Sequence, residues 1–88
     1  MNLNDVIFID SLPKLDIHGF DRETARVAIN DFIRDNKIQK IDIFTIIHGQ
    51  GSGILKKTTS ETLLQNKSVL EFKTYYYNSG CTIVKINI

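Results

Sequence analysis

The stretch IDIFTIIHGQGSG, residues 41–53, decides the fold of this 88-residue chain. Residues 41–47 are rich in β-branched side chains, which is typical of a largely buried strand such as a central parallel one. Glycine then occupies alternate positions, at Gly49, Gly51 and Gly53. Glycines in this arrangement let a loop adopt positive φ and let a bulky group approach the backbone. We therefore expect a buried strand that ends in a tight loop.

Upstream of this stretch, the chain predicts a strand and a helix. Residues 15–18 alternate apolar and polar side chains with period two, as a half-buried strand does, and Gly19 ends the alternation. Asp21 is a candidate N-cap, and the apolar side chains after it recur at helical spacing. This stripe consists of Ala25, Ala28, Ile29, Phe32 and Ile33.

Downstream, the chain predicts a second helix and two strands. Residues 52–66 form the helix, although its threonines are poor helix formers and its leucines give only a partial apolar stripe. The side chains concerned are Thr58, Thr59, Thr62, Leu55, Leu63 and Leu64. Residues 69–77 and 81–88 form strands joined by residues 78–80, a connection with glycine that suits an antiparallel hairpin.

The resulting order, β-α-β-α-β-β, predicts an α/β (α+β) two-layer sandwich. A strand–helix–strand crossover is right-handed, so both helices cover one face of a mixed sheet and leave the other face open. Strand alternation places Leu15 and Ile17 on the covered face, and Asp16, His18 and Lys85 on the other. The covered face also receives Thr82, Val84, Ile86 and Ile88.

The composition fits one folded domain. Pro13 divides an N-terminal arm or edge strand, residues 1–13, from a domain at residues 14–88. The net charge of +1 gives no general indication of a nucleic-acid, membrane or acidic partner. The single cysteine, Cys81, excludes an internal disulfide and a cysteine metal cluster, which favours a reducing compartment. Because no apolar run approaches about 20 residues and the start lacks a basic signal-peptide region, we expect a cytoplasmic protein without a membrane partner.

Two polar segments are expected at one rim of the sheet. Residues 16–19 and 48–53 follow neighbouring parallel strands at their carboxyl ends, where open α/β sheets bind ligands. The glycine loop and the helix N-terminus after it offer unpaired N–H groups to a phosphate, although a turn without a ligand explains the pattern equally well. The spacing fits neither the P-loop nor G-x-G-x-x-G, since Ile54 stands at a glycine position of the latter. Asp16 can orient His18 or hold its charged form, or the pair can be structural.

Basic side chains fall near the same region. Lys56 and Lys57 lie in the first turn of the second helix, where a cation opposes the helix dipole unless an anion is nearby. A solvated helix face is the alternative. Lys73, Tyr75 and Lys85 share the open sheet face, where they suit a nucleic-acid backbone or form an ordinary exposed edge.

Three segments, residues 15–19 (LDIHG), 46–56 (IIHGQGSGILK) and 80–84 (GCTIV), together with a helix that contains Ala25, resemble the Smr (small MutS-related) domain family. The resemblance covers nearly the whole chain from residue 15 onward. It implies a two-layer fold similar to the C-terminal domain of bacterial translation initiation factor three. It also implies nicking or endonuclease activity on DNA or RNA, with the ribosome as a further partner, because some members act on messenger RNA at stalled ribosomes.

The family motifs assign roles to individual positions. The motif L-D-x-H-G maps onto residues 15–19 and implicates Asp16 and His18, while H-G-x-G maps onto residues 48–51. Three positions depart from the commoner family residues: Ser52, Lys56 and Cys81. A lysine in place of arginine binds phosphate as a point charge, without the bidentate fork.

The first hypothesis is therefore a nuclease in which Asp16 and His18 transfer protons. The predicted phosphate-binding residues are Gly19, Gly49, Gly51, Ser52, Gly53, Lys56 and Lys57. With RNA, His18 and His48 divide the roles of base and acid, and no metal is required. With DNA, water attacks, and a divalent cation held partly by Asp16 is the expected cofactor.

Two other functions stay open at this stage. A non-catalytic nucleic-acid or ribosome-binding module would use the same loop without cutting, and the near-neutral charge favours weak binding of this kind. An enzyme or sensor for a small phosphate compound is the third, because an anion cradle does not specify a polymer. The sequence alone selects neither DNA nor RNA, neither single nor double strands, and no oligomeric state.

Overall fold

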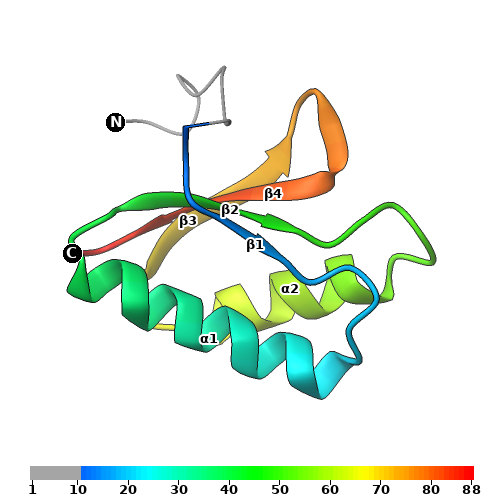
Figure 1. The fold of residues 1–88 in the computed structure, drawn as a ribbon, viewed down its shortest axis with the longest axis horizontal. Coiled ribbons are helices and arrows are strands. Elements are labelled where there is room, and N and C mark those ends of the chain that lie inside the picture. Colours follow the sequence, from blue (N-terminus) through cyan, green and yellow to red (C-terminus); the bar gives the residue numbers. More distant parts are fainter. Residues whose placement is uncertain (1–10) are drawn as a thin grey trace.

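The computed structural model describes residues 11–88. The predicted N-terminal arm therefore lies outside the described residues, except at residues 11–13. The helices and strands follow the predicted order (Figure 1). They are β1 Lys14–Asp16, α1 Arg22–Ile38, β2 Ile43–Ile47, α2 Ile54–Gln65, β3 Val69–Tyr75 and β4 Asn78–Ile86. No helix in the described part of the chain is long and apolar enough to cross a membrane.

The four strands form one mixed sheet in the order β1-β2-β4-β3. The pair β1–β2 is parallel, whereas β2–β4 and β4–β3 are antiparallel. Both helices lie on the same face of this sheet, as Figure 1 shows. The predicted two-layer architecture is therefore confirmed, and the carboxyl ends of β1 and β2 are direct neighbours.

The first helix is formed as its sequence predicts. Asp21 is the N-cap, and its carboxylate accepts a hydrogen bond from the Thr24 backbone N–H at 2.7 Å, which lowers the pKa of Asp21. The stripe buries Ala25, Ile29 and Ile33, with Ala28 and Phe32 packed at its margin. The Phe32 ring meets Phe44 of β2 edge-on, with ring centroids 5.0 Å apart. These contacts fix α1 across the sheet.

The second helix packs through threonines as well as leucines, with Leu55 partly buried against the core. Its buried side chains are Thr58, Thr59, Thr62 and Leu63. Leu64, which the sequence analysis included in the apolar stripe, is 75% exposed, so that assignment is wrong. The Thr62 hydroxyl donates to the Thr58 carbonyl at 2.8 Å. This buried hydroxyl therefore has a hydrogen-bond partner, and its burial does not destabilise the fold as that of an unpaired hydroxyl would.

The hairpin turn differs from the prediction. The strands are joined by residues 76–77, and residues 78–80 belong to β4 instead of forming the connection. The carbonyl of Gly80 accepts hydrogen bonds from the N–H groups of His48 (2.9 Å) and Gly49 (3.1 Å), so this segment is recruited by the loop after β2. At the other end, β4 stops at Ile86, and Ile88 is exposed rather than on the covered face.

The sheet face away from the helices is not fully open, contrary to the prediction. Ile43 and Ile83 are buried on this face and form a small second core, against which Leu12 and Tyr75 pack. Tyr75 is therefore a packing residue and not a fully exposed one. Cys81 is buried, as expected of a small apolar residue, and burial raises the pKa of its thiol.

Candidate functional site

The two signature segments meet at one rim of the sheet. Asp16 of β1 is paired with Ile47 of β2, and the N–H of Ile17 donates to the Ile47 carbonyl at 2.8 Å. The chain then leaves both strands, at His18 and at His48. A groove of about 460 Å³ lies at this point and is lined by residues 18–20 and 48–56. The expected convergence of the two segments is thus what the structure shows.

Asp16 holds the exposed imidazole of His18. One carboxylate oxygen accepts from the His18 backbone N–H at 3.1 Å and lies 2.5 Å from Nδ1 of its ring. The side-chain hydrogen bond with His18 is the main reason that the pKa of Asp16 is lowered, so the carboxylate stays ionised. An acceptor at Nδ1 places a proton there and leaves Nε2 as the nitrogen that can exchange a proton with a ligand. His18 is 72% exposed, which suits that role.

The glycine loop lies directly against His18. Gly49 has φ +81°, and a Cβ built on it would lie 3.6 Å from Cβ of His18. Gly53, with φ +85°, occupies the N-cap position of α2, so the first turn of this helix begins without a side-chain cap of its own. The N–H groups of that turn point out of the helix start, where a partial positive charge favours an anion. The loop therefore offers backbone N–H donors, and its glycines let another group come close to the backbone.

His48 lies in a different environment, because it is buried with 4% of its surface exposed. Its Nδ1 is 3.0 Å from the Gly49 carbonyl, and its Nε2 is 2.9 Å from the Thr82 hydroxyl. A carbonyl only accepts, so Nδ1 carries the proton and Nε2 accepts from Thr82. Burial is the main cause of a lowered pKa of His48, with a contribution from the positive charge of Lys56, while the Gly49 bond opposes it. The ring is a neutral clamp between the loop and β4.

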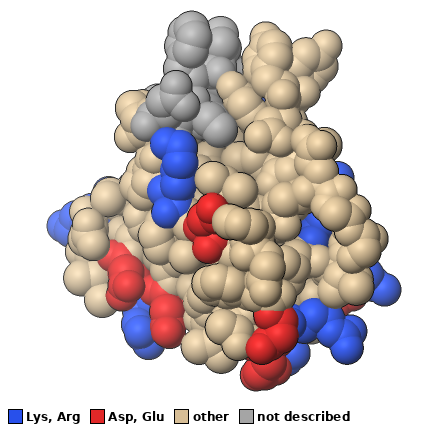
Figure 2. Space-filling model, turned by 45° about the vertical axis from the view of Figure 1, so that its right-hand side comes forward, with Lys and Arg blue, Asp and Glu red and all other residues tan. Residues whose placement is uncertain are grey.

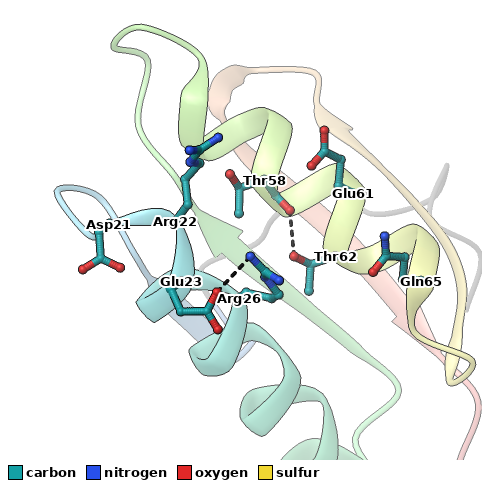
Figure 3. Close-up of a pocket in the computed structure, with 8 residues that line it drawn as sticks. All are labelled: Asp21, Arg22, Glu23, Arg26, Thr58, Glu61, Thr62 and Gln65. Atoms are coloured by element: carbon teal, nitrogen blue, oxygen red, sulfur yellow. Dashed lines mark hydrogen bonds and ion pairs between the residues drawn. The ribbon is translucent and has the colours of Figure 1, made fainter.

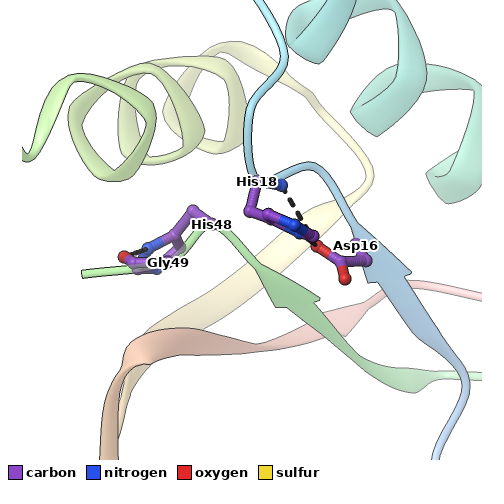
Figure 4. A network of polar contacts seen from close by, with 4 residues as sticks. All are labelled: Asp16, His18, His48 and Gly49. Carbon is purple, nitrogen blue, oxygen red and sulfur yellow. Dashed lines mark hydrogen bonds and ion pairs between the residues drawn. The ribbon is translucent and has the colours of Figure 1, made fainter. Parts of the chain in front are cut away.

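Figure 4 shows these as two separate pairs, Asp16 with His18 and His48 with Gly49. Because both ring nitrogens of His48 are already hydrogen-bonded within the protein, this geometry favours a positioning role over the proton transfer that the sequence analysis assigned to it.

The two candidate lysines, Lys56 and Lys57, lie in different surroundings. Lys56 lines the groove, whereas Lys57 does not, and its ammonium lies 4.0 Å from the carboxylate of Glu61 one turn along α2. Both members of that ion pair are exposed, so it contributes little to stability. On the side of the molecule drawn in Figure 2, acidic and basic side chains are interspersed rather than gathered in one basic field. Attraction for an anion must therefore come from local groups.

Four residues of the groove were not anticipated as site residues. Phe20, Ile54 and Leu55 add apolar walls to it, and Gln50 donates from its side-chain amide to Asn78 at 3.1 Å. Thr82 and Gly80 of β4 do not line the groove, but their hydrogen bonds hold His48 and Gly49 in place. The GCTIV segment that carries Gly80 and Thr82 was noticed in the sequence but had received no role.

A larger hollow, of about 640 Å³, lies between α1 and α2 (Figure 3). Its charged side chains have opposite signs, and Arg26 is paired with Glu23 at 2.9 Å. It lacks the conjunction of histidine, glycine loop and helix start, so we place the site in the smaller groove. Within residues 11–88, no three His, Cys, Asp or Glu side chains are grouped in a way that could hold a metal ion.

The fold and this groove define a small α/β domain with an aspartate–histidine pair beside a glycine-rich loop at the start of a helix. A family model described as the Smr domain matches residues 15–87, and the chain therefore belongs to the Smr domain family. The chain is 32% identical over 80 residues to a protein named Endonuclease MutS2 from Alkaliphilus metalliredigens, with 88% of the chain covered. It is also 32% identical over 74 residues to Endonuclease MutS2 from Streptococcus suis, with 81% covered. In both cases it spans only about a tenth of the relative's length.

Two crystal structures share the fold. The Smr domain of Thermus thermophilus MutS2 superposes with a TM-score of 0.85 at 20% identity, covering 88% of this chain and all of that one (100%). YdaL, a stand-alone small MutS-related protein from Escherichia coli, gives a TM-score of 0.80 at 20% identity, covering 85% of this chain and 64% of that one. The family resemblance and the fold class are thereby confirmed.

Proposed function

We propose that this Smr domain is a nucleic-acid endonuclease that cleaves a phosphodiester bond held in the groove between residues 18–20 and 48–56. The observation that supports the proposal is the closeness of two unlike groups, a glycine loop at the start of a helix and an exposed histidine oriented by a carboxylate. The name of the MutS2 relatives supports the same class of activity. DNA or RNA is the proposed partner.

The residues then have distinct roles. Backbone N–H groups of residues 50–53 and the first turn of α2 hold the phosphate, and Lys56 adds a positive charge beside it, while the N–H of Gly49 is bonded to Gly80. Nε2 of His18 accepts a proton from the attacking oxygen, while Asp16 stabilises the imidazolium that forms. His48 keeps the loop in place and exchanges no proton with the substrate.

The proton transfers balance for either substrate. In RNA, the 2′-hydroxyl loses its proton to His18 and attacks phosphorus, the bond to the 5′-oxygen breaks, and that oxygen takes a proton from water. In DNA, a water molecule loses its proton to His18 and attacks phosphorus, and the leaving oxygen is again protonated by water. A divalent cation in the groove would have to bind Asp16, whose carboxylate already holds His18, and one carboxylate supplies few of the oxygen ligands that such an ion needs. The proton transfers therefore rely on the chain's own groups and on water.

The test is cleavage of one sequence prepared as RNA and as DNA, single- and double-stranded, by the unmodified chain and by His18→Ala and His18→Gln. Both variants are expected to lose cleavage by about 100- to 10,000-fold while retaining affinity, because proton transfer is removed and the loop is not. Lys57→Ala is the matched control, since Lys57 lies outside the groove, and its rate should stay within about twofold of the unmodified chain. Equal rates for His18→Ala and the unmodified chain would refute the proposal.

A second function, a non-catalytic binding module, is favoured by one specific observation. The charges on the face drawn in Figure 2 are mixed and the net charge is only +1, so the domain alone is expected to bind weakly. For a pure binder, the unmodified chain would show salt-dependent affinity and no cleavage of any of the four substrates.

A further inference from the structure

Two adjacent tyrosines form the tip of the β3–β4 hairpin, and the turn itself does not explain them. Two-residue hairpin turns favour glycine, asparagine or aspartate. Here the turn consists of Tyr76 and Tyr77, which are 88% and 70% exposed and are the most exposed aromatic side chains among residues 11–88. Large exposed apolar surface at a position that turn geometry does not require indicates a binding surface.

The tyrosine rings are held in a fixed arrangement. Tyr76 and Tyr77 meet edge-on with ring centroids 5.0 Å apart, and Tyr77 meets Tyr75 with centroids 5.6 Å apart. Tyr75 in turn packs against the buried pair Ile43 and Ile83. The exposed rings are thus supported from the second core, which reduces the entropy lost when they bind a partner.

The hairpin tip is tied to the glycine loop. Tyr77 is followed by Asn78, which accepts a hydrogen bond from Gln50, and by Gly80, which accepts from His48 and Gly49. A Cβ on Gly80 would lie 3.1 Å from the Gly49 carbonyl carbon, so the two segments pack as closely as backbones allow. Figure 1 shows the turn between β3 and β4 and the loop after β2 at the same end of the sheet.

The reach between the two features matches a short nucleic-acid strand. Three Cα–Cα steps lead from Tyr77 to Gly80, which is at most about 11 Å along the chain at about 3.8 Å per step. Successive stacked nucleotides rise by about 3.4 Å, so this reach corresponds to about three of them. Aromatic rings bind unpaired bases by stacking on faces that a duplex keeps covered, and they do so with little regard to sequence.

We propose that Tyr76 and Tyr77 form a stacking platform for unpaired bases next to the phosphate in the glycine loop, which makes a single-stranded segment the preferred substrate. This inference rests on the proposed function, because it requires a nucleic-acid strand in the groove. The hairpin tip then selects unpaired over paired strands, while His18 takes part in the cleavage chemistry.

The experiment measures, by fluorescence anisotropy at one fixed salt concentration, the affinity of the full chain for end-labelled oligonucleotides. The probes are a single strand as RNA and as DNA, the same strand paired to its complement, and the single strand with abasic residues on either side of its central phosphate. The variants are Tyr76→Ala, Tyr77→Ala, and the corresponding phenylalanine variants, which keep the ring face. Leu64→Ala is the matched control, because Leu64 is 75% exposed on α2, away from the hairpin.

Each alanine variant is expected to weaken single-strand binding by about tenfold. The phenylalanine variants and Leu64→Ala should stay within about twofold of the unmodified chain, and duplex affinity should not change. On the abasic strand the alanine variants should lose nothing further, because the stacked bases are already gone. The chain holds no tryptophan, so quenching of its tyrosine fluorescence by a single strand provides a direct readout, which Tyr76→Ala and Tyr77→Ala should each reduce.

Three results would overturn the platform: unchanged single-strand affinity in the alanine variants, an equal loss on duplex or abasic probes, or a change of oligomeric state as their only effect. The last would assign the tyrosines to a contact between copies of the chain. If the unmodified chain binds none of the probes, the proposed function fails as well. If it binds and cleaves while the tyrosine variants behave normally, only the platform is refuted.

Discussion

The two histidines of this chain occupy opposite environments at the same rim of the sheet. His18 is 72% exposed and is held by a carboxylate, whereas His48 is 4% exposed and is held by a carbonyl and a hydroxyl. A carboxylate stabilises an imidazolium, whereas burial disfavours one, and burial is the main cause of the lowered pKa of His48. In the proposed function, the same residue type therefore serves proton transfer in one place and loop geometry in the other.

The two histidines should give opposite phenotypes when each is replaced by alanine. His18→Ala should lose cleavage as described above, with a free energy of unfolding within about 0.5 kcal/mol of the unmodified chain, because an exposed side chain is removed. His48→Ala should instead destabilise the fold by about 1–3 kcal/mol, since a buried hydrogen-bonded group is lost and Thr82 is left unpaired. For a domain of this size that corresponds to a melting temperature lower by at least about 4 °C.

Thermal unfolding and single-turnover cleavage, measured on the same preparations, check this contrast. Thr82→Val should reproduce part of the destabilisation, while Thr74→Val is the matched control, because Thr74 is paired with Thr82 on β3 but is exposed. A stable His48→Ala variant with no cleavage would mean that His48 takes part in the chemistry.

Replacing Gly49 by alanine should lower the free energy of unfolding, whereas the same replacement at Gly51 should not. Gly49→Ala places a side chain at φ +81°, which costs about 1–2 kcal/mol, although the contact with His18 itself is of ordinary length. A Cβ at Gly51 would meet nothing within 4 Å and the residue has no positive φ, so Gly51→Ala should leave stability nearly unchanged. Urea unfolding of the two variants compares them directly, and equal effects would show that the loop adopts another conformation.

The environment of His48 predicts a dependence of stability on pH. Its pKa in the folded chain lies below the ordinary value of 6.5, so the unfolded chain binds the proton first as the pH falls. Stability should therefore decrease as the pH drops below about 6.5 and level off once the pH passes the folded pKa. Unfolding curves of the unmodified chain and of His48→Gln between neutral and mildly acidic pH test this, since the glutamine variant should lack that part of the slope. An identical slope in both would assign the effect to another group.

The smallest effect separates the two lysines. Lys56→Ala should weaken oligonucleotide binding and reduce the slope of affinity against salt concentration by about one counterion, because Lys56 lines the groove. Lys57→Ala should change the slope by less, since Lys57 lies beside Glu61. Reversed slopes would place the strand along the outer face of α2.

The features that local sequence determines were predicted well. The Asp21 cap and the α1 stripe depend on residues within one or two turns, and the pairing of β1 with β2 follows the tendency of consecutive strands to be neighbours. These two regularities were enough to place His18 beside the glycine loop. The pairing of Lys57 with Glu61, four residues later, was also readable in the sequence and was overlooked.

The errors at the hairpin turn and at His48 involve partners distant along the chain. Residues 78–80 have the composition of a turn, but their hydrogen bonds go to the loop at residues 48–50, and this recruitment moves the turn to the tyrosines. Likewise, the burial of His48 depends on Thr82, 34 residues away. The threonine face of α2 could not be recognised from helix propensity, because a close approach of the helix to its neighbours decides which side chains fit.

The position of Gly53 at the start of α2 links occupancy of the groove to the integrity of the helix. Most helices satisfy their first N–H groups with a serine, threonine or aspartate of their own, but here an incoming anion would take that place. A ligand bound at the loop would then cap the first turn of α2. Because it binds the folded chain, an excess of ligand should raise the melting temperature in proportion to the logarithm of its concentration.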